Sequence, residues 1–192
     1  MFGWLAAHPA AWGRPFHGGH AERRWLRMPG GMLAQHLMRL GHVLYLPGPA
    51  MDAALPACPT GWLAERRELA FLLRPHRLAV AGVVDTDGPR EWLECVDHSG
   101  RVQARLYLLP DTDYLAWDAL LAAGERVSAP QPGMPQDFRP RGACLARFHG
   151  YLLAGLTVFG LDRSVAVSRL GHEVAQRIAR AEAVAMPRHV SG

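Results

Sequence analysis

His149 is the residue best placed to do chemistry in this sequence. Leu145, Leu152, Leu153 and Leu156 stand at spacings of three, four and seven from it. In a helix these spacings place all four leucines on the face that carries the histidine. An imidazole on an apolar face has lost much of its water, so it needs either a hydrogen-bond partner or a ligand. The residue types alone leave open both a core histidine and a binding histidine.

Other reactive groups have simpler explanations. His17 and His20 have the spacing of a metal-binding pair on a helix, but the glycines between them disfavour a helix. Asp85 and Asp87 flank a turn and are explained by turn chemistry. Gly171–Glu173 contains His-Glu but lacks the second histidine of a zinc-binding HExxH motif.

Composition indicates a folded chain that is not embedded in a membrane. The 192 residues, 49% of them hydrophobic, are enough for one domain with a sizeable core. No apolar run approaches the ~20 residues that span a bilayer, and the first residues lack the basic start of a secretory signal. The three cysteines (Cys58, Cys95 and Cys144) form no CxxC pair, which argues against a disulfide framework. We therefore expect a cytoplasmic protein.

The positive charge is carried entirely by arginine, and the formal net charge is +4. Arginine forms bidentate pairs with carboxylates and phosphates. An acidic ligand fits this charge, whereas nucleic acid binding needs more support than +4 provides. Arginines on the last helix (Arg163, Arg169, Arg177 and Arg180) lack a recognisable helix-turn-helix setting, so we do not expect a nucleic acid partner.

The hydrophobic pattern predicts an α+β fold, with helices packed on an antiparallel sheet. The clearest hairpin joins 91–97 to 101–109, and its second strand alternates so that Arg105 and Tyr107 share one face. Three further strands or strand-like runs are expected, at 42–46, 69–73 and 78–84. Four helices are expected: one over 24–40 that starts at Arg24 or Gly31, one over 113–123, one through His149 to Gly160, and one over 163–185 capped by Asp162. The inner side of the helix over 113–123 is expected to consist of Leu115, Ala116, Ala119, Leu120 and Ala123.

Four segments follow from these elements. We expect a flexible N-terminus over 1–23, an α+β unit over 24–124, a proline-rich linker over 125–142 and a C-terminal helical pair over 143–186.

Several motifs, taken in order, resemble the HemS/HmuS/ChuS family of bacterial cytoplasmic hemin-trafficking and hemin-degrading factors, whose smaller relatives are the ChuX/HutX proteins. Val96–Gly100 resembles the family's hairpin turn, Arg105–Leu108 its basic strand and Asp111–Trp117 its helix start. Leu40–Leu46 resembles an earlier strand. Arg147–Ala166 resembles the segment that joins the family's two repeats. The chain is similar to a single repeat of this family followed by the joining segment.

The resemblance implies a hemin-binding protein, with heme b as the cofactor and His149 as the axial ligand of the heme iron. It implies that Leu145, Leu152 and Leu153 hold the porphyrin. Arg105 is the expected partner of the heme propionates, with Arg74 or Arg77 standing in for the family's opposing arginine. Partners implied by heme uptake are a heme-uptake transporter or a heme-degrading enzyme.

The chain also departs from the family pattern. Pro47–Pro49 replaces a Thr-Arg-Asn motif, Phe71 stands at the position of the opposing arginine, and the second repeat is missing. We expect a hemin carrier without catalytic residues, and we hypothesise that a homodimer replaces the second repeat. Two alternatives stay open: an enzyme that degrades heme with an external reductant, and a regulatory or interaction module that kept the fold without hemin.

Overall fold

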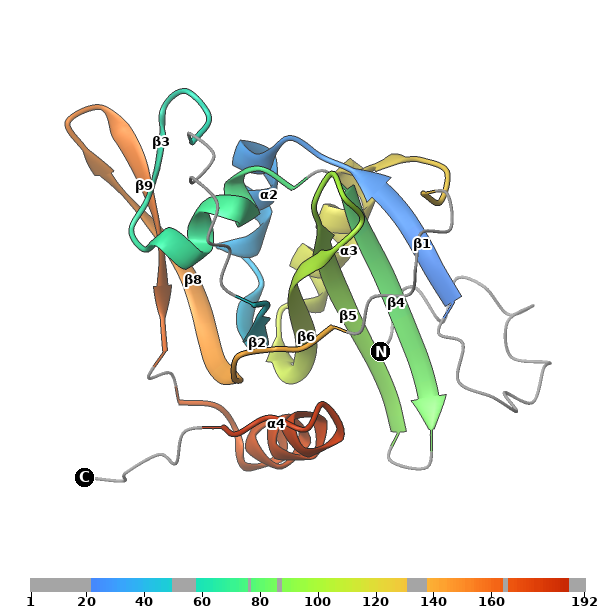
Figure 1. Ribbon diagram of the computed structural model, residues 1–192. Helices are drawn as coiled ribbons and strands as arrows, with labels where there is room; N and C mark the ends of the chain where they lie inside the picture. Colours follow the sequence, from blue (N-terminus) through green and yellow to red (C-terminus); the bar gives the residue numbers. More distant parts are fainter. Residues whose placement is uncertain are drawn as a thin grey trace.

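The described residues form a nine-stranded sheet with helices on both of its faces (Figure 1). The computed structural model describes residues 22–49, 58–75, 77–85, 88–130, 138–163 and 166–186. The strand order across the sheet is β3-β9-β8-β2-β6-β5-β4-β1-β7. In chain order the elements are β1 (Glu22–Arg27), α2 (Gly30–Leu37), β2 (Gly41–Pro47), β3 (Trp62–Ala64), the 3-10 helix η2 (Arg67–Leu73), β4 (Arg77–Asp85), β5 (Gly88–Val96), β6 (Val102–Thr112), α3 (Tyr114–Ala123), β7 (Glu125–Arg126), β8 (Cys144–Leu153), β9 (Leu156–Asp162) and α4 (Arg169–Ala181).

The α+β class with an antiparallel sheet and packed helices is confirmed. Every strand pair of the described sheet is antiparallel except β3 with β9. The expected strand at 42–46 and the hairpin of β5 and β6 are present. Strands from both sides of the proline-rich segment belong to one sheet, because β8 pairs directly with β2.

Two apolar cores lie on opposite faces of the sheet. The first packs α2, η2 and α3 on one face, with Trp117 and Phe148 among its largest buried side chains. The second packs α4 on the other face, where Ala175, Ile178 and Ala179 meet Leu44 and neighbouring sheet residues. In Figure 1, α4 lies below the sheet, apart from α2 and α3. In the central strand β2, residues 43–46 are all buried, because Val43 and Tyr45 face the first core and Leu44 and Leu46 face the second.

The predicted helix that carries His149 is wrong. Residues 144–162 form a β-hairpin, β8 and β9, so the C-terminal pair of helices reduces to α4 alone. The turn between the strands is Ala154–Gly155, and both residues have positive φ, 47° and 80°. A two-residue turn with positive φ at both positions matches the right-handed twist of the two strands that it joins. Residues 145, 149 and 153 are evenly spaced by four, which fits one face of a strand as well as one face of a helix.

Three other boundaries also differ from expectation. Residues 24–27 belong to β1, and the helix begins at Gly30, directly after Pro29, which has no N–H to donate to a sheet. The run 69–73 is the 3-10 helix η2, because a short buried apolar run has no period that separates strand from helix. The last helix begins after Ser168, whose hydroxyl accepts from the Gly171 N–H, and not after Asp162.

The inner face of α3 was only partly predicted. Asp113 caps the helix as the sequence suggests, accepting from the N–H groups of Leu115 and Ala116. The side chains that the helix buries are Trp117, Leu120 and Leu121, while Leu115 is 82% exposed. The expected N-terminal segment 1–23 lies outside the described residues except for its last two positions.

Candidate functional site

His149 lies on β8, directly opposite Gly160 of β9. A Cβ atom at position 160 would come within 2.3 Å of the His149 ring. Glycine is therefore needed at this position for the imidazole to lie over the neighbouring strand. The side chain of His149 is 31% exposed, so it is neither a core histidine nor a freely solvated one.

Two carboxylates approach one nitrogen of this ring. Asp162 Oδ1 lies 3.5 Å from His149 Nε2, and Glu65 Oε2 lies 3.9 Å from the same atom. Glu65 is held there because its backbone N–H donates to the carbonyl of Phe159 at the end of β3. Among the described residues, none makes a hydrogen bond to the other ring nitrogen, Nδ1. Both acids therefore lie beside Nε2, on one side of the imidazole ring.

Exposed apolar side chains continue from His149 along the same face. Tyr151 stacks on the imidazole, with ring centroids 6.3 Å apart and 15° between the planes. Leu63 of β3 lies beside Val158 of β9, which in turn lies opposite Tyr151 of β8, so Leu63 and Tyr151 share this face. Leu153 and Leu156 lie opposite each other on the same face, closer to the turn. We call His149, Tyr151, Leu153, Leu156 and Leu63 the hairpin face. Its four apolar members are each 40–54% exposed.

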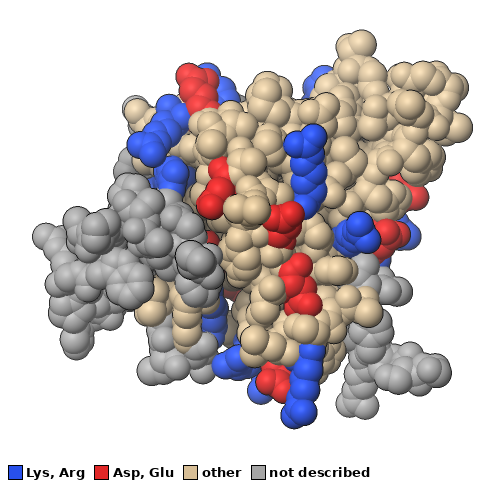
Figure 2. Space-filling model, turned by 180° about the vertical axis from the view of Figure 1, so that it is seen from behind, with Lys and Arg blue, Asp and Glu red and all other residues tan. Residues whose placement is uncertain are grey.

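The end of the hairpin carries no charge. In Figure 2 the lobe at the upper right, which holds the hairpin tip in the reversed view of Figure 1, shows neither red nor blue side chains. The sequence from Gly150 to Leu156 contains no ionisable residue except Tyr151. The charged groups are found at the base of the hairpin, where Arg147 of β8 lies opposite Asp162 of β9 in the strand register. The hairpin face is thus apolar at the tip and charged at the base.

Three leucines were expected to surround His149, and the structure places only one of them on the exposed face that carries the histidine. Leu153 lies on the hairpin face. Leu152 is 78% exposed but points to the opposite face, because side chains alternate along a strand. Leu145 shares the face of His149 but is buried under α4.

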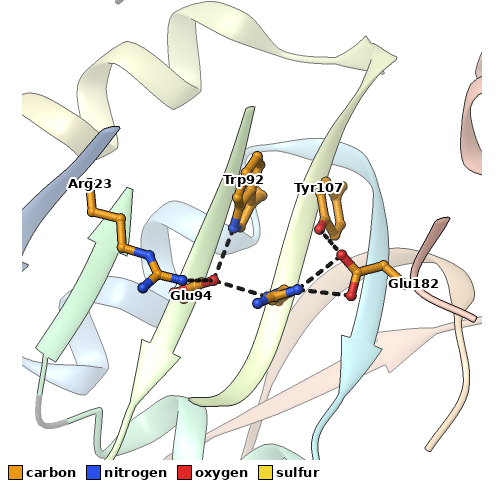
Figure 3. A network of polar contacts seen from close by, with 6 residues as sticks. Arg23, Trp92, Glu94, Tyr107 and Glu182 are labelled. Atoms are coloured by element: carbon orange, nitrogen blue, oxygen red, sulfur yellow. Dashed lines mark hydrogen bonds and ion pairs between the residues drawn. The ribbon is translucent and has the colours of Figure 1, made fainter. Parts of the chain in front are cut away.

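Arg105 lies in a separate polar network that joins Glu94 on the sheet to Glu182 at the end of α4 (Figure 3). Its Nε donates to Glu94 at 3.0 Å, and its Nη1 donates to both oxygens of Glu182 at 2.9 and 2.8 Å. Tyr107 also donates to Glu182, and burial together with this bond raises the pKa of the phenol. Burial lowers the pKa of Arg105, but Glu94, Tyr107 and Glu182 together raise it by more. The guanidinium is therefore charged and already paired with two carboxylates.

Arg74 and Arg77 lie away from His149. Arg74 is an exposed residue at the end of η2, which packs on the face of the sheet opposite to His149. Arg77 begins β4 and donates to the carbonyl of Ser128. β4 is four strand positions from β8, or about 19 Å at the usual strand spacing. The structure therefore does not gather these arginines and His149 around one small site.

Arg147 is the basic residue that sequence reasoning missed. It is exposed on β8, two positions before His149 and on the same face. A strand period applied to 145–153 would have identified it, whereas a helical period hides it.

Two features are absent from the described residues. They contain no group of three or more His, Cys, Asp or Glu side chains that could hold a metal ion. None of their helices is long and apolar enough to cross a membrane.

Comparisons with known proteins gave distant structural similarities. No family model and no curated protein matches the chain. One similar solved structure is the heme-degrading enzyme ChuS of Escherichia coli O157:H7, with 14% identity, a TM-score of 0.40, and coverage of 67% of this chain and 47% of ChuS. Another is holo-PhuS, a heme-binding protein from Pseudomonas aeruginosa, with 14% identity, a TM-score of 0.40, and coverage of 60% and 39%. The chain spans less than half the length of either protein.

Proposed function

We propose that this chain binds heme on the hairpin face, with His149 as the axial ligand, and serves in heme uptake or trafficking. The observation that carries the proposal is a partly exposed imidazole at the base of an exposed apolar surface. Heme is an apolar ring with a metal at its centre and two carboxylates at one edge. Its metal needs a ligand such as an imidazole, and its ring needs an apolar surface. The resemblance of the β5–β6 hairpin and of α3 to the motifs of the hemin-binding family gives independent support.

The residues around His149 fit heme as a bound group. Bound heme supplies an iron atom that accepts a neutral imidazole nitrogen. Histidine ligands are usually oriented by a carboxylate or carbonyl at their second nitrogen, and Asp162 lies 3.5 Å from Nε2. Tyr151, Leu153, Leu156 and Leu63 offer apolar contact area on the same side of the sheet. Arg147 is placed at the charged end of this face, where it suits a propionate.

Arg105 has a different place in this proposal. Glu182 occupies its Nη1, so a propionate would have to displace the end of α4 to reach it. We therefore assign the first propionate contact to Arg147. Arg77 begins a strand four positions from β8, too far from His149 to complete the same site, and Arg74 follows η2 on the other face of the sheet.

A titration with ferric hemin followed at the Soret band tests the proposal. The unmodified chain should show a saturable shift at one hemin per chain, and the His149→Ala variant should lose it. His98→Ala is the matched control, because His98 is exposed in the turn between β5 and β6, well away from the hairpin. Retained binding in His149→Ala would reject this ligand, and an absence of saturable binding to the unmodified chain would reject the heme function.

Asp162 provides a second test of the same site. Asp162→Asn keeps the side chain's size but removes the charge facing Nε2, so we expect hemin affinity to fall roughly tenfold or more. The change should alter affinity without abolishing the Soret shift. An unchanged affinity would show that Asp162 does not orient the ring.

Heme degradation is the competing function. Adding a reductant to the hemin complex in the presence of catalase separates the two. A carrier should keep its Soret band, whereas an enzyme would lose it and release an open tetrapyrrole. Catalase is needed because peroxide formed from the reductant bleaches heme without enzymatic turnover.

A further inference from the structure

The end of the β8–β9 hairpin extends beyond the neighbouring strand. The pairing of β2 with β8 runs as far as Arg147, whereas β8 and β9 stay paired up to the turn. The loop that leads into β3 lies beside this end, because the Thr157 N–H donates to the Gly61 carbonyl. In Figure 1 the hairpin end and this loop reach the same side of the molecule. We call residues 150–157 together with residues 60–62 the projecting tip.

The projecting tip exposes apolar side chains on both of its faces. Leu152 is 78% exposed on one face, and Leu153 and Leu156 are 54% and 40% exposed on the other. No residue of the projecting tip carries a charge. The heme site proposed above uses the face of Leu153 and leaves Leu152 in water. A flat partner would also cover only one face, whereas a fluid apolar phase surrounds both.

Polarity changes in a fixed order along the hairpin. The leucines lie at its end, and Tyr151 lies two residues back from Leu153, or about 7 Å. Trp62 lies beside Thr157 in the pairing of β3 with β9, so a second aromatic ring is found near the same level. The nearest arginine on β8 is Arg147, six residues before Leu153, or about 20 Å away. Aliphatic, then aromatic, then charged is the order found from the acyl chains of a bilayer outward.

The charges next to the projecting tip are mainly basic. Met38 Sδ lies 2.5 Å from where a Cβ of Gly150 would be, and the exposed Arg39 is the next residue. Among the described residues of this region, five exposed arginines accompany three carboxylates: Arg39, Arg66, Arg67, Arg147 and Arg163, with Glu65, Glu68 and Asp162. One arginine of this set, Arg163, is paired with Glu68. The excess of arginine suits a negatively charged surface.

We propose that the projecting tip inserts into the surface of an anionic lipid bilayer. The leucines enter the boundary between headgroups and acyl chains, Tyr151 and Trp62 lie at the level of the headgroups, and the arginines face the acidic lipids. The length from Leu153 to Tyr151, about 7 Å, falls within the depth of about 5–10 Å that is usual for peripheral insertion. At this depth, water and headgroups still satisfy the backbone groups along the outer edge of β8. Insertion needs no heme, because Leu152 lies on the face opposite His149.

Co-sedimentation with vesicles, without hemin, tests the insertion. The unmodified chain should bind vesicles made of equal parts of phosphatidylglycerol and phosphatidylcholine, and bind phosphatidylcholine alone more weakly. Leu152→Asp should lower the partition coefficient by at least about tenfold, because a carboxylate replaces an inserted leucine. Leu115→Asp is the matched control, since Leu115 is 82% exposed on α3, outside the projecting tip, and the change in net charge is the same. Circular dichroism of each variant checks that it is folded.

Quenching of tryptophan fluorescence identifies the part of the chain that enters the lipid. Leu152→Trp keeps the projecting tip apolar and adds one fluorophore to the six native tryptophans. Vesicles whose lipids carry bromine on their acyl chains should quench this added fluorescence. Leu115→Trp is the control, and its added fluorescence should stay unquenched because α3 remains in water.

Three results would overturn the insertion. The first is an absence of binding to the anionic vesicles. The second is equal binding of Leu152→Asp and Leu115→Asp, and the third is equal quenching of the two tryptophan variants, since in both cases the arginines alone would hold the lipid. Self-association that Leu152→Asp abolishes, without vesicle binding, would assign the projecting tip to a protein partner instead. Because hemin is absent throughout, a failure of the heme site leaves these outcomes unchanged.

Discussion

Glu91 is a buried carboxylate without a hydrogen bond in the part of the chain that the structure describes. It is 3% exposed on β5, and neither of its oxygens has a partner. Burial, with Asp118 nearby, raises its pKa to about 7, and Trp117 and Arg24 counteract only part of the shift. At neutral pH the folded protein therefore holds this group close to its midpoint of titration.

Glu91→Gln should change how stability depends on pH. The pKa of Glu91 is higher in the folded than in the unfolded chain, so the folded state binds more protons between about pH 4.5 and 7. The free energy of unfolding contributed by Glu91 is present at low pH and is lost as pH rises through 7. Glutamine stays neutral, so at pH 8 the variant should be more stable than the unmodified chain by up to about 3 kcal/mol.

Urea unfolding at pH 5 and pH 8 measures this effect. The stability difference between variant and unmodified chain should grow from pH 5 to pH 8. Glu125→Gln serves as the control, because Glu125 is exposed on β7 and should show no such growth. A constant difference at both pH values would mean that Glu91 is ionised in the folded protein at both.

At the scale of elements, the β8–β9 hairpin depends on its two-residue turn. Ala154 has a positive φ of 47°, which is unfavourable for a residue with a Cβ, and Gly155 follows with 80°. Asparagine tolerates this backbone better, and Asn-Gly is the preferred sequence for such turns.

Ala154→Asn should therefore stabilise the protein by about 0.5–1 kcal/mol, or roughly 1–4 °C in melting temperature for a chain of this size. Differential scanning calorimetry measures the shift. Ala123→Asn is the comparison, because position 123 ends a helix, where asparagine brings no gain from positive φ. A drop in melting temperature for Ala154→Asn would contradict the turn geometry.

The helix α4 is attached to β6 at both ends. At its start, the Ser168 N–H and hydroxyl donate to Asp111 at 2.7 and 2.9 Å. Beyond its end, Glu182 accepts from Arg105 and Tyr107. The middle of the helix buries mainly small residues, so these polar contacts make a large part of its attachment.

Glu182→Gln should loosen α4. The change removes the charge that pairs with Arg105, and it should lower the free energy of unfolding by about 1–3 kcal/mol. Amide hydrogen exchange should accelerate over 169–181 more than in the strands. Glu173→Gln on the same helix removes only an exposed pair with Arg169, so a change within about 0.5 kcal/mol is expected. Equal effects of the two variants would argue against the attachment.

At the scale of the whole molecule, one sheet holds together the segments on both sides of the proline-rich stretch. β8 lies between β2 and β9, and α4 covers the apolar residues Leu44, Leu46, Tyr107 and Leu109. Removing residues after 130 would expose this surface and leave an edge of β2 unpaired.

We therefore expect unfolding in a single cooperative transition. Tryptophan fluorescence and far-ultraviolet circular dichroism should give coincident urea curves. A fragment ending at residue 130 should aggregate or stay unfolded, because the apolar face under α4 has no cover. Two separate transitions, or a stable fragment, would show instead that the α+β unit and the C-terminal segment fold independently.

Local chemistry in the sequence determined the elements whose signals are short-range. Asp113 caps α3, the alternation around Arg105 and Tyr107 makes β6 a strand, and Asp97–Gly100 turns the chain between β5 and β6. These features follow from the periods and turn preferences of a few neighbouring residues. The same signals predicted an α+β chain with an antiparallel sheet.

Tertiary structure decided the surroundings of His149. Its spacing to Leu145 and Leu153 fits a helix or a strand equally, and only pairing with β9 selects the strand. Glu65 reaches the histidine from another part of the chain because β3 joins the far side of β9. Arg105 faces α4 for a similar reason: which element covers a given face of a strand depends on the packing of the whole sheet. Contacts between distant residues depend on how the elements pack, and local periodicity carries no information about that packing.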